Sequence, residues 1–376
     1  MRSRLQRFTA AAMLAACLLA PWQHPAACTT FCLSDGTNVV FGRNYDFEIG
    51  DGMIFVNKRG VSKVSRLAGA RVDASTGRGA SRGGEKAASW VSRYASVTFN
   101  QFGREFPTGG MNEKGLVVEL MWLDEAKYPS RDGRPTVGVL EWIQYQLDTR
   151  ASVEELVAHV DDVRIRGSVP LHYLVADRTS ATATIEFLDG RLNVHRGASL
   201  PVPVLTNDTY DRSVSSLGSY TAFGGSAAPP RGPGSLARFA RAASMVKIFA
   251  GARATSISRY AFDVLASVAQ GDHTRWSIVY DLTALEVQFR TWSHPEIRKV
   301  RLSAFDASCG SPVKVLDVNA ALAGDVTTRF TDYTRQANLD LIAGSYRGVS
   351  FLSDTPRSEI EATASHPESM SCAKTD

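Results

Sequence analysis

Hydrophobic and polar residues alternate with a period of two directly after Ala27, and this alternation predicts a pair of β-strands. The segment from Cys28 to Phe47 contains a first strand, turn residues at Ser34-Asp35-Gly36, and a second strand through Val39-Val40-Phe41. An Asp-Gly pair between two alternating segments is a strong signal for a β-hairpin. We therefore expect residue 28 to lie at the rim of a sheet, where the first strand begins.

The same kinds of pattern predict further strands and four helices. The additional strands are expected at residues 94–99, 115–120, 171–176, 182–187, 277–280 and 285–291. The helices are expected at residues 139–147, 152–160, 235–250 and 257–269. The second helix has Ser152 as its N-cap and Glu155 three residues later, which is the pattern of a capping box. Antiparallel strand pairs with helices gathered between them indicate an α+β fold with helices layered on sheets.

The composition is that of a globular protein and excludes one class of partner. The 376 residues are 44% hydrophobic and 21% charged, which fits one large domain or two small ones. The net charge is only +4 and the basic residues are scattered, so we expect no nucleic-acid partner. We place one domain at residues 28–352. Residues 353–376 are rich in Ser, Glu, Pro and Thr, which predicts a disordered tail.

The first 27 residues have the layout of a secretory signal peptide. Arg2, Arg4 and Arg7 precede an apolar run from Phe8 to Leu19, and small residues follow at Pro25-Ala26-Ala27. The run is too short for a comfortable bilayer span, and no later stretch approaches the roughly eighteen apolar residues that a span requires. We therefore expect an exported protein, periplasmic or secreted, without stable insertion into a membrane.

Three routes of processing remain open at this point. Ala27 suits the residue before a signal-peptidase cut, whereas Pro25 is a poor third residue upstream of it. Signal peptidase could cut directly before Cys28, or it could cut earlier and leave a short propeptide that the protein removes from itself. In the third route Leu14-Ala15-Ala16-Cys17 is a lipoprotein box, which would anchor the chain through Cys17 and leave Cys28 internal.

Four cysteines follow the leader: Cys28, Cys32, Cys309 and Cys372. In an oxidising compartment they can form two disulfides, but a nucleophilic Cys28 would leave three, one of them without a partner. We expect Cys32 to be a buried thiol, and we consider a bridge between Cys309 and Cys372 that would fix the C-terminus.

A cysteine at a processed N-terminus carries a thiol and a free α-amino group on one residue. The amine has a reference pKa of about 7.7–8.0 and the thiol of about 8.5, so the amine can assist removal of the thiol proton. The predicted hairpin brings Arg43 and Asp46 back beside Cys28. The charge of Arg43 can lower the pKa of the thiol, and Asp46 can accept from the amine or orient it. Taken alone, Arg43 and Asp46 would fit an ion pair on the protein surface. Taken alone, Cys28 would fit a structural or lipidated cysteine.

Four motifs occur in a fixed order. They are the CT start followed by FGRNYDF, Gly110-Met111-Asn112-Glu113-Lys114-Gly115-Leu116, Val204-Leu205-Thr206-Asn207, and Ala237-Arg238-Phe239. In order and spacing they resemble the choloylglycine hydrolase family, which includes penicillin V acylases and bile salt hydrolases. The similarity extends from Cys28 to about Arg290, and four ordered motifs are far more specific than any one of them.

The resemblance implies a four-layer αββα sandwich of antiparallel sheets, the N-terminal-nucleophile hydrolase fold, and hydrolysis through an acyl-enzyme. Carried over by position, Cys28 would be the nucleophile, Arg43 and Asp46 its partners, Asn207 an oxyanion donor and Arg238 a charged member of the site. This chemistry needs no metal and no organic cofactor. Family members often form tetramers, so the implied assembly is a homotetramer. Without the family resemblance, Asn207 would be interpreted as part of an ordinary Asx turn. Arg238 would be interpreted as an arginine on the surface of a helix.

Trp122 departs from the family pattern. It stands ten residues after Asn112, where bile salt hydrolases have an Asn. The resemblance implies that the second oxyanion donor at this place is a backbone N–H, so catalysis does not require the Asn side chain. An indole adds apolar surface and removes a polar contact, which suits an aryl or fatty acyl group more than a conjugated sterol. We expect Phe223, next to the loop residues Gly224-Gly225, to line the substrate entrance.

The sequence therefore predicts an exported hydrolase that cleaves the linear C–N amide bond of an N-acyl small molecule. Penicillin V and acyl homoserine lactones are the expected substrates, and conjugated bile salts are the alternative. The export signal resembles that of the penicillin-acylase-like members from Gram-negative bacteria. Two rivals remain: an acyltransferase, in which an amine outcompetes water at the acyl-enzyme, and a lipid-anchored binding protein that has lost the chemistry.

Overall fold

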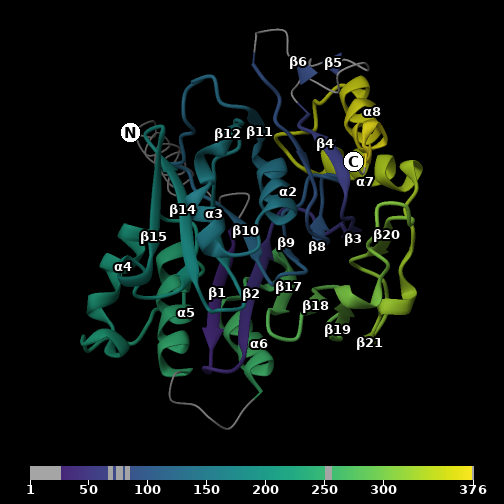
Figure 1. Cartoon of the computed structure of the whole chain (residues 1–376). Helices are drawn as coiled ribbons and strands as arrows, with labels where there is room; N and C mark the ends of the chain where they lie inside the picture. Colours follow the sequence, from purple (N-terminus) through teal and green to yellow (C-terminus); the bar gives the residue numbers. More distant parts are fainter. Residues whose placement is uncertain (1–26, 67–70, 73–78, 81–84, 250–255, 375–376) are drawn as a thin grey trace, which may run out of the picture.

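Two stacked β-sheets with helices on their outer faces make up the part of the chain that the computed structural model describes (Figure 1). The described residues are 27–66, 71–72, 79–80, 85–249 and 256–374. This arrangement is the four-layer α+β fold that the family resemblance predicts. The expected signal peptide, residues 1–27, lies outside the described residues except for Ala27.

The first sheet has seven strands in the order β16-β1-β2-β17-β18-β19-β21. Its strands are β1 (Thr29–Ser34), β2 (Val39–Asp46), β16 (Val204–Leu205), β17 (Thr274–Asp281), β18 (Glu286–Thr291), β19 (Arg298–Arg301) and β21 (Gly324–Asp325). The predicted hairpin is confirmed, because β1 and β2 pair antiparallel along their length. At its turn Gly36 has a φ of +90°, and the Asp35 carboxylate accepts hydrogen bonds from the backbone N–H groups of Thr37 and Asn38.

The second sheet has nine strands in the order β15-β14-β13-β10-β9-β8-β3-β20-β22. Its strands are β3 (Met53–Asn57), β8 (Ser96–Asn100), β9 (Gly109–Asn112), β10 (Val117–Trp122), β13 (Leu171–Ala176), β14 (Thr182–Leu188), β15 (Arg191–Arg196), β20 (Lys314–Asp317) and β22 (Thr331–Asp332). The shorter strands are β4 (Val61–Val64), β5 (Arg71–Val72), β6 (Gly79–Ala80), β7 (Ser89–Val91), β11 (Thr136–Gly138), β12 (Arg164–Arg166) and β23 (Ser371–Cys372). All six additional strands predicted from the sequence are present, with ends that differ by a few residues.

The four predicted helices are also present. They are α2 (Val139–Thr149), α3 (Val153–Ala158), α5 (Ser235–Phe249) and α6 (Ile257–Val268), to which the structure adds α4 (Tyr210–Ser215). Ser152 caps α3 as expected, because its hydroxyl accepts from the Glu155 N–H at 3.2 Å. Helices α5 and α6 pack on β1 and β2 of the first sheet, and α2 packs on β9 and β10 of the second (Figure 1). None of the described helices is long and apolar enough to cross a membrane.

The strand β2 is covered on both faces, and this determines where the polar residues of the site lie. All eight of its residues are buried. Because side chains alternate along a strand, Arg43 and Tyr45 face the second sheet, whereas Asn44 and Asp46 face the helix layer. On the helix side, Asn44 donates to the Leu265 carbonyl of α6 at 2.8 Å. The polar groups of β2 therefore lie inside the protein core, where each one needs a partner.

The C-terminal segment is ordered, so the prediction of a disordered tail for residues 353–376 is wrong for the described residues 353–374. Helices α7 (Arg335–Gly348) and α8 (Arg357–Ser365) pack on each other, and β23 pairs with β4. A disulfide joins Cys309 to Cys372, which confirms that pairing, while Cys32 is a buried free thiol as expected. The tail has a polar composition, but its order comes from tertiary contacts and a covalent bond that composition does not report.

Candidate active site

The strand register brings the predicted site residues to the start of β1. Thr30 pairs with Leu205 of β16, and Thr29 pairs with Asn44 of β2. Cys28, one residue before β1, therefore lies between the end of β2 and the residue that follows β16 by two positions, Asn207. Cys28 is 1% exposed. Local pairing alone thus places a cysteine between two strand ends, as the hairpin prediction required.

The side chain of Arg43 brings a positive charge into contact with the Cys28 thiol. One guanidinium nitrogen, Nη2, lies 3.9 Å from Cys28 Sγ, and the other, Nη1, donates to the Thr108 carbonyl at 2.6 Å. Burial raises the pKa of the Cys28 thiol above its ordinary value, and the positive charge of Arg43 acts against this increase. The expected influence of Arg43 on the thiol therefore has the predicted sign, although burial is the larger effect.

Asp46 lies at the end of β2, and its contacts differ in part from the expected ones. Its carboxylate accepts from the Thr274 hydroxyl at 2.5 Å and from the Gln270 amide at 2.7 Å. Its backbone carbonyl accepts from the Ala27 N–H at 3.2 Å, and the Cys28 thiol donates weakly to the same carbonyl at 4.0 Å. Burial raises the pKa of the Asp46 carboxyl, and the charge of Arg238 opposes this increase. Asp46 thus contacts Ala27 and Cys28 through its backbone carbonyl. Its carboxylate is held by Gln270, in the loop before β17, and by Thr274, at the start of β17.

Asn207 and Arg238 form a connected pair around Cys28. Asn207 Oδ1 accepts from the Cys28 backbone N–H at 2.9 Å, and its Nδ2 donates to the Trp122 carbonyl at 2.9 Å. Arg238 of α5 donates to Asn207 Oδ1 at 2.7 Å, to the Cys28 carbonyl at 2.5 Å and to the Thr29 hydroxyl at 2.7 Å. Because Arg238 has only donors, it fixes which end of the Asn207 amide faces Cys28. The amide nitrogen of Asn207 keeps one N–H beyond the bond to Trp122.

A buried carboxylate beside Arg43 is a member of the site that sequence reasoning missed. Glu119 of β10 forms a close ion pair with Arg43 and accepts from the Tyr280 hydroxyl at 2.5 Å. Glu119 is fully buried, and a Cβ at Gly109 would overlap its carboxylate, so the glycine makes room for it. A signal was present in the sequence, because Glu119 is the only charged residue within the apolar strand VVELMW.

Cys28 opens onto an apolar cavity of about 200 Å³. Its walls carry aromatic and aliphatic side chains from both sheets, from α2 and from the C-terminal segment. They include Tyr45, Phe47, Phe102, Phe106, Leu120, Trp122, Leu140, Leu171, Tyr346, Phe351 and Leu352. Trp122 lies in this wall as predicted, and its indole N–H donates to Asp124 at 2.6 Å. Such a cavity accepts an apolar group and leaves the thiol as the main reactive atom on its surface.

Phe223 lies elsewhere, so the expectation that it lines the substrate entrance is wrong for this structure. It lies on a different cavity together with Val202, Val246 and Lys247. The Lys247 ammonium lies 4.5 Å from the centre of the Phe223 ring. Gly224 has a φ of +92°, and the turn of residues 221–223 that it ends packs against α5.

Among the residues that the structure describes, no group of three or more His, Cys, Asp or Glu side chains is arranged to hold a metal ion. The polar side chains around Cys28 bind one another and the main chain instead.

A cysteine at the start of β1, in a sandwich of two mainly antiparallel sheets between helix layers, defines the class of N-terminal-nucleophile hydrolase folds. Within this class the comparison with protein families is specific. Residues 28–314 match the family described as linear amide C–N hydrolases, choloylglycine hydrolase family. The chain belongs to this family.

Individual relatives agree with this assignment. The penicillin V acylase of Pectobacterium atrosepticum is 30% identical over 182 residues, which cover 44% of this chain and 48% of that protein. The match thus spans about half the length of this curated relative. The solved penicillin V acylase from Agrobacterium tumefaciens is 25% identical, with a TM-score of 0.67 over 82% of this chain and 98% of its own. A conjugated bile acid hydrolase from Clostridium perfringens shares the fold, at 19% identity and a TM-score of 0.64 over 79% of this chain and 98% of its own.

Proposed function

We propose that the protein hydrolyses the linear C–N amide bond of N-acyl small molecules, with Cys28 as the nucleophile. One observation carries the proposal: Cys28 opens onto an apolar cavity and is contacted by Arg43, Asn207 and Arg238. A thiol, a cation near it and a fixed amide are the parts that acyl transfer through a thioester needs. Membership in a family of linear amide hydrolases supports the same reaction.

The first step requires a free amine on Cys28. With Ala27 attached, the nitrogen of Cys28 is an amide that donates to Asn207 Oδ1. Hydrolysis of the Ala27–Cys28 bond turns it into an α-amine with a reference pKa of about 7.7–8.0. In its neutral form this amine accepts the thiol proton. The positive charge of Arg43 stabilises the resulting thiolate against the cost of its burial.

The thiolate then attacks the carbonyl carbon of the substrate, and a C–S bond forms while negative charge develops on the carbonyl oxygen. The remaining N–H of the Asn207 amide stabilises this oxyanion. When the tetrahedral intermediate collapses, the C–N bond breaks and the leaving amine takes the proton from the α-ammonium of Cys28. Water attacks the thioester with the α-amine as base, so that the carboxylic acid leaves and the thiol is restored.

The cavity supports an apolar acyl group as the part of the substrate that is bound. Its walls near Cys28 are formed by rings and aliphatic chains, with Trp122 among them. A phenoxyacetyl or straight alkanoyl group matches this lining, so penicillin V and N-acyl homoserine lactones are the proposed substrates. Conjugated bile salts are second, because a sterol nucleus is bulkier than the cavity of about 200 Å³ favours.

The decisive experiment determines the N-terminal sequence and the intact mass of the exported protein, with and without Cys28→Ser. We expect the wild type to begin at Cys28 and to hydrolyse penicillin V or an acyl homoserine lactone faster than glycodeoxycholate. A mature chain that begins at Cys17, or anywhere else upstream of Cys28, contradicts the mechanism because Cys28 then has no free amine. Preference for glycodeoxycholate would contradict only the substrate.

The proposal includes export and assembly. We propose that removal of residues 1–27 releases the protein into the periplasm or the medium, where it forms a homotetramer. Cell fractionation and light scattering of the purified protein test these two statements separately.

A further inference from the structure

Part of the cavity wall comes from the end of the chain, beyond the residues that match the family. The match ends at residue 314. Tyr346 of α7, Phe351 and Leu352 from the turn after it, and Thr363 of α8 all line the cavity beside Cys28. This C-terminal segment, residues 335–374, thus supplies atoms that a bound acyl group would touch.

The segment is fixed to the rest of the cavity by hydrogen bonds. Asn338 accepts from the Arg104 N–H at 2.8 Å, and the Ser345 hydroxyl donates to the Gln101 carbonyl at 2.6 Å. Both partners belong to the loop that contributes Phe102 and Phe106 to the same cavity. Directly before Phe351, Ser350 donates through its N–H and its hydroxyl to the Glu48 carboxylate, at 3.0 Å in each case. These hydrogen bonds therefore fix the position of the C-terminal segment relative to the part of the cavity wall that the sheets form.

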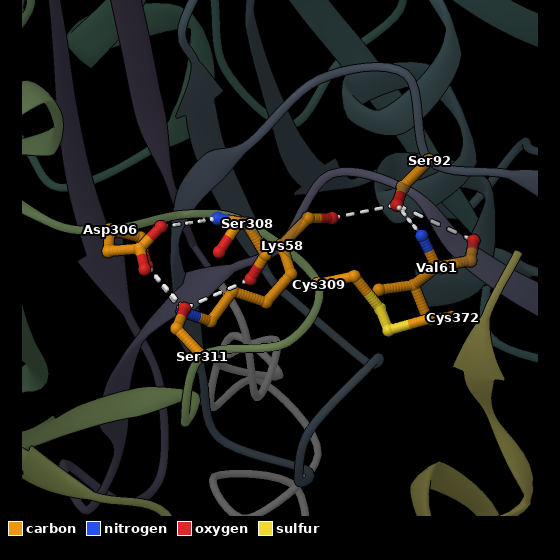
Figure 2. The surroundings of a disulfide bond; sticks show 8 residues. All are labelled: Lys58, Val61, Ser92, Asp306, Ser308, Cys309, Ser311 and Cys372. Atoms are coloured by element: carbon orange, nitrogen blue, oxygen red, sulfur yellow. Dashed lines mark hydrogen bonds between the residues drawn. A yellow bond between two sulfur atoms is a disulfide. The ribbon is translucent and has the colours of Figure 1, made fainter. Parts of the chain in front are cut away.

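A covalent bond holds the far end of the segment. The disulfide between Cys309 and Cys372 joins it to the loop before β20, as Figure 2 shows. Next to it, β23 pairs with β4, and the Ala373 N–H donates to the Gly60 carbonyl at 2.7 Å. On the other side of α8, Glu359 forms an ion pair with Arg66 at 2.7 Å, and Arg66 itself lines the cavity.

At Phe351 a single side chain separates the cavity from solvent. Its ring lies 5.9 Å from the ring of Trp122, and yet 45% of the residue is exposed to solvent. One side of this ring therefore faces the cavity with Trp122, and the other side faces water. Removing the ring would open the cavity to solvent at this point without disturbing either sheet.

We propose that the C-terminal segment is the acyl-selectivity wall of the enzyme, with Phe351 as the residue that sets the length of the acyl group. This inference rests on the proposed function, and it adds that straight-chain or aryl acyl groups short enough to end before Phe351 are preferred. Each methylene that leaves water on binding improves affinity by about fourfold. Affinity should therefore rise along a series of straight chains until the chain meets Phe351, and then fall.

The test determines the chain length at which affinity stops rising and begins to fall, called the break below. It does so by binding and by turnover. Calorimetry with Cys28→Ala records the binding of straight-chain acids from butanoate to dodecanoate. Hydrolysis of the corresponding N-acyl homoserine lactones by protein with Cys28 intact gives kcat/KM for the same lengths. The two series are repeated with Phe351→Ala, with Phe351→Trp, and with Trp292→Ala as the matched control, since Trp292 is 61% exposed and lies outside the cavity lining.

We expect Phe351→Ala to move the break to longer chains and Phe351→Trp to move it to shorter ones, while Trp292→Ala leaves it in place. The opposite signs keep the test informative if one variant folds poorly. A break that stays in place in both Phe351 variants overturns the selectivity wall, and hydrolysis by the wild type would still support the proposed function. A break that moves in calorimetry, while the wild type hydrolyses neither the acyl homoserine lactones nor penicillin V, supports the wall and overturns the proposed function.

Discussion

The ion pair between Arg43 and Glu119 allows the charge at the thiol to be changed in both directions. Arg43 Nη2 lies 3.9 Å from Cys28 Sγ, and Glu119 contacts the same guanidinium from the second sheet. At an effective dielectric constant of about 20, a charge pair at this distance is worth about 4 kcal/mol. Arg43→Met should therefore raise the pKa of the thiol, because the Arg43 charge is removed and the Glu119 charge remains.

Glu119→Gln should act in the opposite direction. It removes the negative charge that offsets Arg43, so the pKa of the Cys28 thiol falls. In the double variant both charges are absent, and its thiol pKa should lie between those of the two single variants.

The free energy of unfolding of these variants should follow a different order. Arg43→Met leaves a buried carboxylate without its partner and should cost about 3–5 kcal/mol, whereas the double variant should recover much of this loss.

The assay is the rate of alkylation of Cys28 by iodoacetamide as a function of pH, followed by intact mass, with urea titration of each variant for stability. The midpoint of the rate profile should move to higher pH for Arg43→Met and to lower pH for Glu119→Gln. If Glu119→Gln moves the midpoint upward, or if Arg43→Met leaves it unchanged while the protein stays folded, the electrostatic reasoning is refuted.

Three other expectations concern different parts of the molecule. Asn207→Ala should lower kcat by about 100- to 1000-fold through loss of an oxyanion donor, and steady-state kinetics showing less than a tenfold loss would contradict this role. Iodoacetamide at pH 8 should label Cys28 but not Cys32 in the folded protein, because burial raises the pKa of the Cys32 thiol to about 12; labelling of both before denaturation would contradict it. Replacing Cys309 and Cys372 by Ser should lower the free energy of unfolding by about 4 kcal/mol, since the bridge closes a loop across 63 residues, and an unchanged urea midpoint would argue against the bridge.

The parts of the site that the sequence predicts are those connected by local pairing. Arg43 and Asp46 could be placed beside Cys28 because a tight hairpin fixes the register of β1 and β2. Asn207 and Arg238 come from distant segments, and only the ordered motifs of the family point to them. Their actual contacts with Cys28 follow from the pairing of β1 with β16 and from the packing of α5 on β1.

The parts that could not be predicted depend on contacts between segments that lie far apart in the sequence. Glu119 reaches Arg43 from the opposite sheet, and Asp46 is contacted by Thr274 of the neighbouring strand β17 and by Gln270 from the loop before that strand. No local pattern states which residues of two sheets will face each other. Phe223 was misplaced for the same reason, because the direction in which a Gly-Gly turn folds is decided by its neighbours. The tail was misjudged because average polarity says nothing about a disulfide.

The central position of β2 has a consequence for how the protein loses its activity. This strand pairs with β1 on one side and β17 on the other, and both of its faces are covered. Backbone amides in such a strand exchange hydrogen with solvent only when the whole domain unfolds, whereas peripheral elements open locally at lower free energy. Amides around Arg43 should thus be among the slowest to exchange, and those of α8 should exchange earlier. On warming, the protein should lose its discrimination between acyl groups before it loses its capacity to cleave them.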